Sequence, residues 1–146
     1  MDRALKNSLE YQPTLIPLHA TTLQGVWEDL LRVAQGVGKI EAGNNLLAHY
    51  QSRISAIADR CRVEGPRPSV ACIEWMEPLM AAGNWVPELV ELAGGHSIFG
   101  EPGTHAPWIT WEALAEGNPD MLILMPCGFS MPRIEEEMSL LTQNPV

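Results

Sequence analysis

The chain has 146 residues, of which 46% are hydrophobic and 18% are charged, so it is able to bury a core of its own. Its formal net charge of −9 argues against partners that are bound through phosphate groups, such as nucleic acids and anionic membrane surfaces. No run of about 18 apolar residues is present, so no insertion into a membrane is expected. The N-terminus also lacks the apolar segment of a signal peptide.

Two short elements are expected at the start of the chain. Apolar spacing predicts a helix over residues 2–10, and Pro13 ends it. Residues 14–18 have the composition of a short strand, which Pro17 restricts to a sheet edge or a strand end.

Two amphipathic helices are predicted next. Thr21 and Gln24 have the spacing of a capping box, so we expect a helix from there to Val37. A longer helix is expected from Glu41 to about Val63, with an apolar stripe along one face. At 1.5 Å per residue this second helix would be about 34 Å long, close to the diameter of a small domain.

From residue 69 onward, short apolar segments alternate with helical ones. The expected order is strand 69–74, connection 75–84, helix 88–93, strand 96–100, helix 111–115, strand 121–125 and helix 132–141. Strands that alternate with helices predict an α/β fold with a parallel sheet, here a Rossmann-like lobe preceded by a long helix.

The carboxyl ends of the predicted strands are the expected ligand site, because ligands of parallel α/β sheets bind there. Two of these ends carry aromatic residues or glycine, at Glu74–Trp75 and at 126–129. Four of the five tryptophans lie between Trp75 and Trp111. Tryptophan is seldom fully buried and suits a ligand-facing position, although packing in the core is the alternative.

Catalytic motifs are absent from the sequence or incomplete in it. No GxGxxG follows a strand, and neither HExxH nor GxSxG occurs. Cys61, Cys72 and Cys127 are expected to be small buried hydrophobic residues. A nucleophilic Cys127 with His105 as its base is the weakest alternative, because no third residue of such a set is evident. We therefore expect no enzyme, no resident metal and no catalytic cofactor.

Three ordered segments carry a resemblance to a known family. Residues 70–95, VACIEWMEPLMAAGNWVPELVELAGG, closely resemble the cobalamin-binding branch of the iron-siderophore/vitamin B12 substrate-binding proteins of ABC transporters. Residues 107–112, PWITWE, and 118–129, NPDMLILMPCGF, look like the next block of the same family. The resemblance covers most of the chain from Leu15 onward.

The family fold has two α/β lobes joined by one long helix, with the ligand in the cleft between them. The resemblance implies that residues 1–38 are a remnant of the N-terminal lobe, 39–66 the connecting helix and 67–146 an incomplete C-terminal lobe. The chain thus looks like an internal fragment that lacks most of the N-terminal lobe and the extreme C-terminus. The family implies a periplasmic location, whereas a chain that truly starts at Met1 favours the cytoplasm.

The resemblance also implies a set of site residues, matched position by position. The ligand-binding residues carried over are Glu74, Trp75, Asn84, Trp85, His105, Pro107, Trp108, Gly128 and Phe129. Tryptophan faces suit the apolar plate of a corrin ring, and Asn84 with backbone amides suits its polar edges. We expect Trp75, Trp85 and Trp108 to be partly exposed around one cavity. Glu112 matches a glutamate of the family that docks on the membrane transporter. An equally weighted alternative is that Glu112 only stabilises the N-terminus of its helix through the helix dipole.

Two functions are therefore expected. The leading one is a binding protein for cobalamin, or for a related metal chelate such as haem or a ferric siderophore, that delivers it to an ABC transporter permease. The alternative is a single-lobe α/β interaction module that binds no ligand. We also expect a homodimer, because one lobe leaves apolar helix residues uncovered. These residues are Leu23, Trp27, Leu30, Leu46, Tyr50, Ile54 and Ile57.

Overall fold

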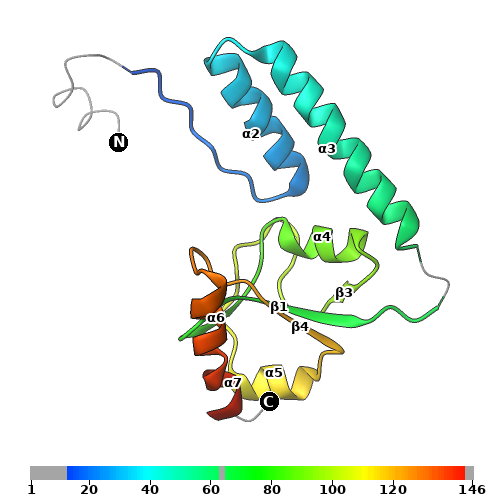
Figure 1. Ribbon diagram of the computed structural model, residues 1–146, viewed down its shortest axis with the longest axis vertical. Helices are drawn as coiled ribbons and strands as arrows, with labels where there is room; N and C mark the ends of the chain where they lie inside the picture. Colours follow the sequence, from blue (N-terminus) through cyan, green and yellow to red (C-terminus); the bar gives the residue numbers. More distant parts are fainter. Residues whose placement is uncertain (1–12, 63–64, 144–146) are drawn as a thin grey trace.

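The computed structural model describes residues 13–62 and 65–143, in two parts (Figure 1). One part is a pair of helices, α2 (Leu23–Gly36) and α3 (Ile40–Arg60), and the other is an α/β lobe. The predicted α/β class is confirmed. The helix predicted over residues 2–10 lies outside the described residues.

The start of α2 differs from the sequence prediction by one residue. Thr22, not Thr21, is the N-cap, and its side-chain oxygen accepts a hydrogen bond of 3.1 Å from the backbone N–H of Gly25. A capping box needs a Glu or Gln side chain three residues after the N-cap, but this position is occupied by Gly25. The Gln24 side chain instead donates a hydrogen bond of 3.1 Å to the Glu28 carboxylate. The predicted capping box is therefore wrong, although the helix predicted from it is confirmed.

The strand predicted over residues 14–18 does not form. Residues 13–21 run without regular secondary structure, and no strand in the described part of the chain pairs with them. A strand needs a neighbour for its backbone hydrogen bonds, so apolar composition alone is insufficient.

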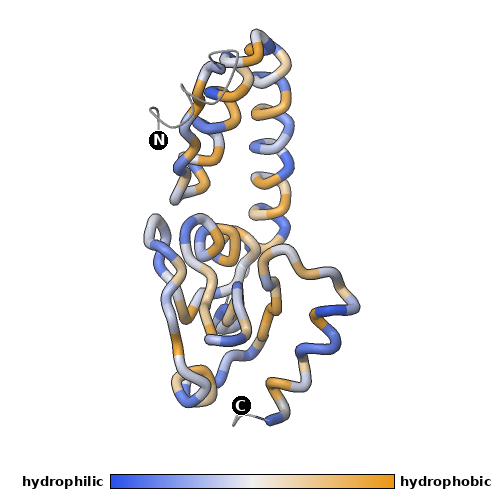
Figure 2. Tube along the Cα trace, turned by 90° about the vertical axis from the view of Figure 1, so that its left-hand side faces the viewer, coloured by the Kyte–Doolittle hydropathy of each residue, from blue (hydrophilic) through white to orange (hydrophobic). Residues whose placement is uncertain are grey.

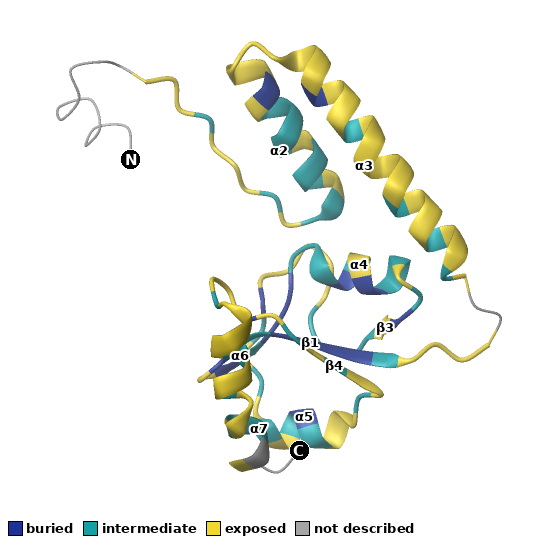
Figure 3. Ribbon diagram, viewed as in Figure 1, coloured by how far each residue is buried: buried dark blue, intermediate teal, exposed yellow. Residues whose placement is uncertain are grey.

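The long predicted helix is confirmed as α3, which ends at Arg60 rather than near Val63. It packs against α2 at Gly43, where an added Cβ would clash with Ala34. Beyond this contact α3 continues toward the lobe with most residues exposed (Figure 3). Apolar residues recur along both helices of the pair (Figure 2).

Strand β1 (Ser69–Met76) is the centre of a mixed sheet. It pairs in parallel with β4 (Met121–Leu124) on one edge and with β3 (His96–Ser97) at the start of its other edge. The predicted parallel pairing is confirmed for these strands. On the same edge as β3, the C-terminal end of β1 pairs antiparallel with β2 (Leu79–Ala81). This strand lies within residues 75–84, for which the sequence predicts a connection without a strand. A tight turn at Glu77–Pro78 allows this hairpin, which reverses the chain within two residues.

Four helices complete the lobe: α4 (Val86–Leu92), α5 (Trp111–Gly117), α6 (Met131–Glu137) and α7 (Ser139–Gln143). Thr110 caps α5 by accepting a hydrogen bond of 3.1 Å from the N–H of Ala113. The single helix predicted over 132–141 is instead divided at Met138 into α6 and α7.

The core lies on both faces of β1, because successive side chains of a strand point to opposite faces. Ile73 packs with Leu114 of α5 on one face, and Cys72 packs with Val90 of α4 on the other. Burial raises the pKa of the Cys72 thiol. The predicted burial of Cys127 is wrong, because this residue lies beyond the end of β4 and is exposed.

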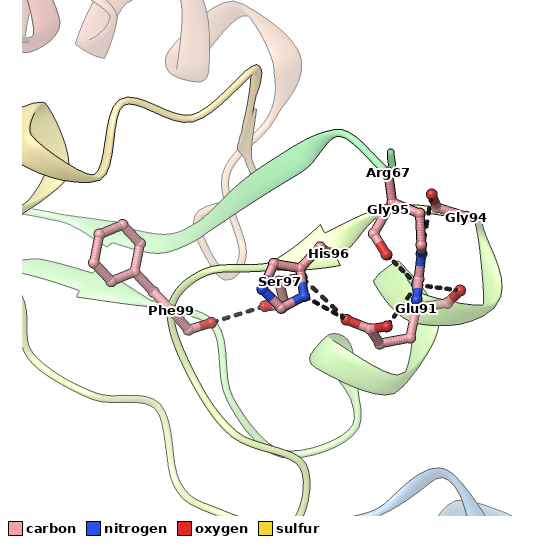
Figure 4. A network of polar contacts seen from close by, with 7 residues as sticks. All are labelled: Arg67, Glu91, Gly94, Gly95, His96, Ser97 and Phe99. Atoms are coloured by element: carbon pink, nitrogen blue, oxygen red, sulfur yellow. Dashed lines mark hydrogen bonds and ion pairs between the residues drawn. The ribbon is translucent and has the colours of Figure 1, made fainter. Parts of the chain in front are cut away.

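A polar clasp joins the start of β1 to the turn after α4 (Figure 4). The Arg67 guanidinium contacts Glu91 Oε2 at 2.5 Å and the carbonyl oxygens of Glu91, Gly94 and Gly95. The other carboxylate oxygen, Glu91 Oε1, accepts a 3.3 Å hydrogen bond from the N–H of Ser97 and lies 3.3 Å from His96 Nδ1. Partial burial raises the pKa of Glu91, but the hydrogen bonds from Arg67 and Ser97 outweigh it, so the net pKa is lowered.

We expect this clasp to weaken in acid. A carboxyl with a lowered folded-state pKa stabilises the fold above its ordinary value of about 4, and this contribution is lost as pH falls through the folded pKa. Since the Arg67–Glu91 pair is partly exposed, its loss should cost only about 0.5 kcal/mol. Urea unfolding at neutral and acid pH should show a smaller pH effect for Glu91→Gln than for the unaltered chain. Glu116→Gln, an exposed control on α5, should show the full effect; equal pH effects in both variants would contradict the expectation.

Candidate functional site

A β-bulge in β1 sets the direction of Trp75. Ile73 pairs with Ala81 and Trp75 pairs with Met80, so β1 contains one residue more than β2 between the two pairs. In a regular strand Trp75 would share the face of Ile73, which is buried against α5. The extra residue, Glu74, turns Trp75 to the α4 face of the sheet, which is the face toward the helix pair (Figure 1).

Trp75 belongs to a row of large side chains on this face. Met80 forms a backbone bridge with Trp108 as well as pairing with Trp75, so the three residues lie in register across the sheet. Neighbouring strands are about 5 Å apart, and paired residues point to one face. On the opposite edge of β1, the Phe129 ring meets Trp75 edge-on, with ring centroids 5.2 Å apart. We call Trp75, Met80, Trp108 and Phe129 the aromatic floor.

The floor is open to solvent and carries one cation. Trp108 is 64% exposed, while Trp75, Met80 and Phe129 are half-buried. The Arg133 guanidinium lies over the Phe129 ring, 3.5 Å from its centroid. Met80 and Arg133 are not among the sequence-predicted site residues. The position of Met80 follows only from strand register. Phe129 and Arg133 are four residues apart near the start of α6, and this spacing could have predicted that the two side chains are neighbours.

A second group of predicted residues lies where residues 83–85 meet the loop 103–106. The N–H of Asn84 donates to the carbonyl of Thr104 at 2.6 Å, and the N–H of Gly103 donates to the carbonyl of Asn84 at 3.1 Å. Gly83 permits this approach, because an added Cβ would lie 2.6 Å from the backbone nitrogen of Ala106. His105 follows Thr104 in this loop and is exposed.

Trp85 also faces the helix pair across a cavity of about 340 Å³. The cavity is lined by Leu18, His19, Ala20, Val26, Asp29 and Trp85. Asp29 Oδ2 accepts hydrogen bonds of 3.0 Å from the N–H groups of His19 and Ala20 and so fixes one wall. Glu88 Oε2 accepts a bond of 2.6 Å from the N–H of Leu23, which connects the lobe to the start of α2.

The predicted site residues thus lie in two groups on one side of the lobe. Glu74, Trp75, Pro107, Trp108, Gly128 and Phe129 belong to the floor or its backbone, where Cys127 N–H donates to the Glu74 carbonyl at 3.3 Å. Asn84, Trp85 and His105 form the second group. All three predicted tryptophans are partly exposed, but it is Trp85 that lines the cavity beside the helix pair. Glu112 is apart from both groups, exposed in the first turn of α5 on the other face of the sheet.

An apolar groove of about 500 Å³ lies between α2 and α3 and shares Leu18, Val26 and Asp29 with the cavity beside Trp85. Its lining residues are Leu18, Val26, Asp29, Leu30, Val33, Ala34, Val37, Lys39, Ala42, Gly43 and Leu46. Leu46 is 44% exposed and Val37 is 62% exposed. The helix pair therefore presents apolar side chains that nothing else in the described chain covers.

Residues 13–62 and 65–143 contain neither a metal-binding cluster nor a membrane-spanning helix. Within these ranges, no three or more His, Cys, Asp and Glu side chains are grouped so that they could hold a metal ion. No helix of the described chain combines the length and the apolar character needed to cross a bilayer.

Comparison with known families gives a match along almost the whole chain. Residues 7–143 match the family described as periplasmic binding protein. No curated protein matches the sequence.

Several solved structures share the fold. An ABC transporter substrate-binding protein from Listeria monocytogenes has a TM-score of 0.71 and 17% identity, over 87% of this chain and 50% of its own. A periplasmic heme binding protein from Pseudomonas aeruginosa has a TM-score of 0.65 and 21% identity, over 86% of this chain and 46% of its own. The periplasmic vitamin B12 binding protein of Vibrio cholerae has a TM-score of 0.61 and 15% identity, over 99% of this chain and 58% of its own. The chain therefore spans about half the length of these structures, and their shared fold agrees with the resemblance in the sequence.

Proposed function

The chain belongs to the periplasmic binding protein family, and from this premise we propose that it binds cobalamin or a related metal chelate for an ABC transporter. Helix α2 would be part of one lobe, α3 the connecting helix and the α/β lobe the other lobe. The aromatic floor is the observation that carries the proposal. No enzymatic step and no catalytic cofactor form part of it.

The geometry of the floor supports a flat ligand. Trp75 and Trp108 are two strand spacings apart, about 10 Å, and Phe129 borders the row beyond Trp75, with its ring inclined at 66° to the Trp75 ring. A row of this width on one face of a sheet is suited to a broad apolar ring system such as a corrin or a porphyrin. The second group has Trp85 at the cavity beside the helix pair, and its polar residues Asn84 and His105 would meet the polar edge of the ligand.

Titration with cyanocobalamin tests the proposal. We expect saturable quenching of tryptophan fluorescence, with a dissociation constant in the micromolar to millimolar range, because the chain has about half the length of its structural relatives. N-acetyltryptophanamide, titrated in parallel, corrects for light absorbed by the corrin. Quenching that stays linear up to the solubility limit, after this correction, would count against ligand binding.

Two partners belong to the same proposal. Glu112 would dock on the transporter permease, since it is an exposed carboxylate in the first turn of α5, away from the floor. The apolar groove between α2 and α3 would bind a second copy of the chain.

The same groove favours the alternative function, an α/β interaction module that self-associates without a ligand. A dimer that shows no saturable quenching by cyanocobalamin would favour this alternative.

A further inference from the structure

Arg133 is unusual for its position in an acidic chain. The net charge is −9, and from residue 65 to the C-terminus the sequence contains two cations, Arg67 and Arg133. Arg67 is engaged in the clasp with Glu91, at the opposite end of β1 from Trp75. Arg133 is therefore the one cation of the lobe that lies at the aromatic floor.

Two contacts hold the Arg133 guanidinium in place. The Phe129 ring lies beneath it at 3.5 Å, and Glu137 Oε1 lies 3.3 Å from its Nε. The carboxylate of Glu137 thus takes one of the five N–H donors and leaves the Nη1 and Nη2 groups, which form a fork that matches a carboxylate or a phosphate. The side chain is 55% exposed, so this fork is accessible.

An Arg–Glu pair four residues apart is common on helix surfaces and by itself indicates little. The stacking on Phe129 is what distinguishes Arg133, because Phe129 in turn contacts Trp75 in the middle of the floor. A plate that lies on Trp75 would therefore have its rim beside the Arg133 fork. A small free anion would gain little here, since the chain is strongly negative and a single exposed ion pair is weak.

We infer that Arg133 determines specificity at the floor by binding an anionic rim group, a carboxylate or a phosphate, of the plate-shaped ligand. This inference rests on the proposed function. The floor supplies apolar contact, and Arg133 selects and orients the ligand through charge-assisted hydrogen bonds.

Two porphyrins that share one ring system test the inference. Mesoporphyrin IX has two rim carboxylates, and its dimethyl ester has none; each is titrated into the full chain by tryptophan quenching, with the same small amount of dimethyl sulfoxide. The unaltered chain should bind the acid about tenfold more tightly than the ester. Arg133→Gln should reduce this ratio to about one, and Arg133→Lys should keep part of it. Added salt should also lower the ratio for the unaltered chain.

Arg53→Gln is the matched control, because Arg53 is an exposed arginine of α3 away from the floor; it should keep the full acid-to-ester ratio. Circular dichroism checks that every variant is folded. Equal binding of acid and ester by the unaltered chain, or an unchanged ratio in Arg133→Gln, would overturn the role of Arg133 while leaving the proposed function intact. Failure of cyanocobalamin and of both porphyrins to bind would overturn the inference and the proposed function together.

Discussion

Replacing Trp75 by alanine should weaken cyanocobalamin binding by about 1–3 kcal/mol, roughly 5- to 150-fold in Kd. Trp75 lies between Phe129 on one side and the Met80–Trp108 pair on the other, so its loss divides the floor. Trp85→Ala should have an effect of similar size, because Trp85 lines the cavity beside the helix pair. The measurement is the Kd from corrected fluorescence quenching, or from calorimetry for variants that retain too little tryptophan signal.

Glu112→Ala is the control for this experiment, since Glu112 lies on the far face of the lobe and is proposed to contact the transporter instead. Its Kd for cyanocobalamin should equal that of the unaltered chain. A folded Trp75→Ala variant with unchanged affinity would remove the floor from the binding site. If Trp85→Ala alone lost affinity, the cavity beside the helix pair would be the site instead.

The family and the class of fold were accessible from the sequence, because their signals are local. The apolar run of β1 and the length of α3 each follow from patterns within a few residues. The predicted family is confirmed by a match over residues 7–143.

The errors arose where structure depends on partners distant in the sequence. Residues 14–18 have the composition of a strand but lack a neighbouring strand in the described chain. The prediction for 75–84 omitted β2 because its pairing depends on a hairpin and not on periodicity. Cys127 follows an apolar run, yet the sheet has already ended there, so the side chain is exposed.

The sequence indicated aromatic residues near the strand ends but not how they are arranged, and their role in binding stays a prediction. Strict alternation along β1 would place Trp75 with Ile73 in the core, and the bulge that reverses this has no clear signal in the sequence. The contact of Arg133 with Phe129 likewise depends on where α6 begins relative to the end of β4. The sequence could therefore indicate the aromatic residues, while register and turn geometry decide which of them share a surface.

The largest effect on assembly is expected at the groove between α2 and α3. The unaltered chain should have a mass near twice the 16.1 kDa of one chain by light scattering at high micromolar concentration. Leu46→Glu should shift the dimer toward monomer by at least about 100-fold in Kd, about 2.7 kcal/mol, because a carboxylate would enter an apolar interface. Leu46 is the suitable position, since it lines the groove and is 44% exposed.

Asn45→Glu provides the matched control, because it adds the same charge to the exposed adjacent position, which does not line the groove. This variant should remain dimeric, so that a difference between the two variants reports the groove rather than net charge. A monomeric mass for the unaltered chain would contradict self-association. A dimer that persists in both variants would mean that another surface joins the copies, since an apolar groove cannot accept a glutamate in its lining without losing most of its affinity.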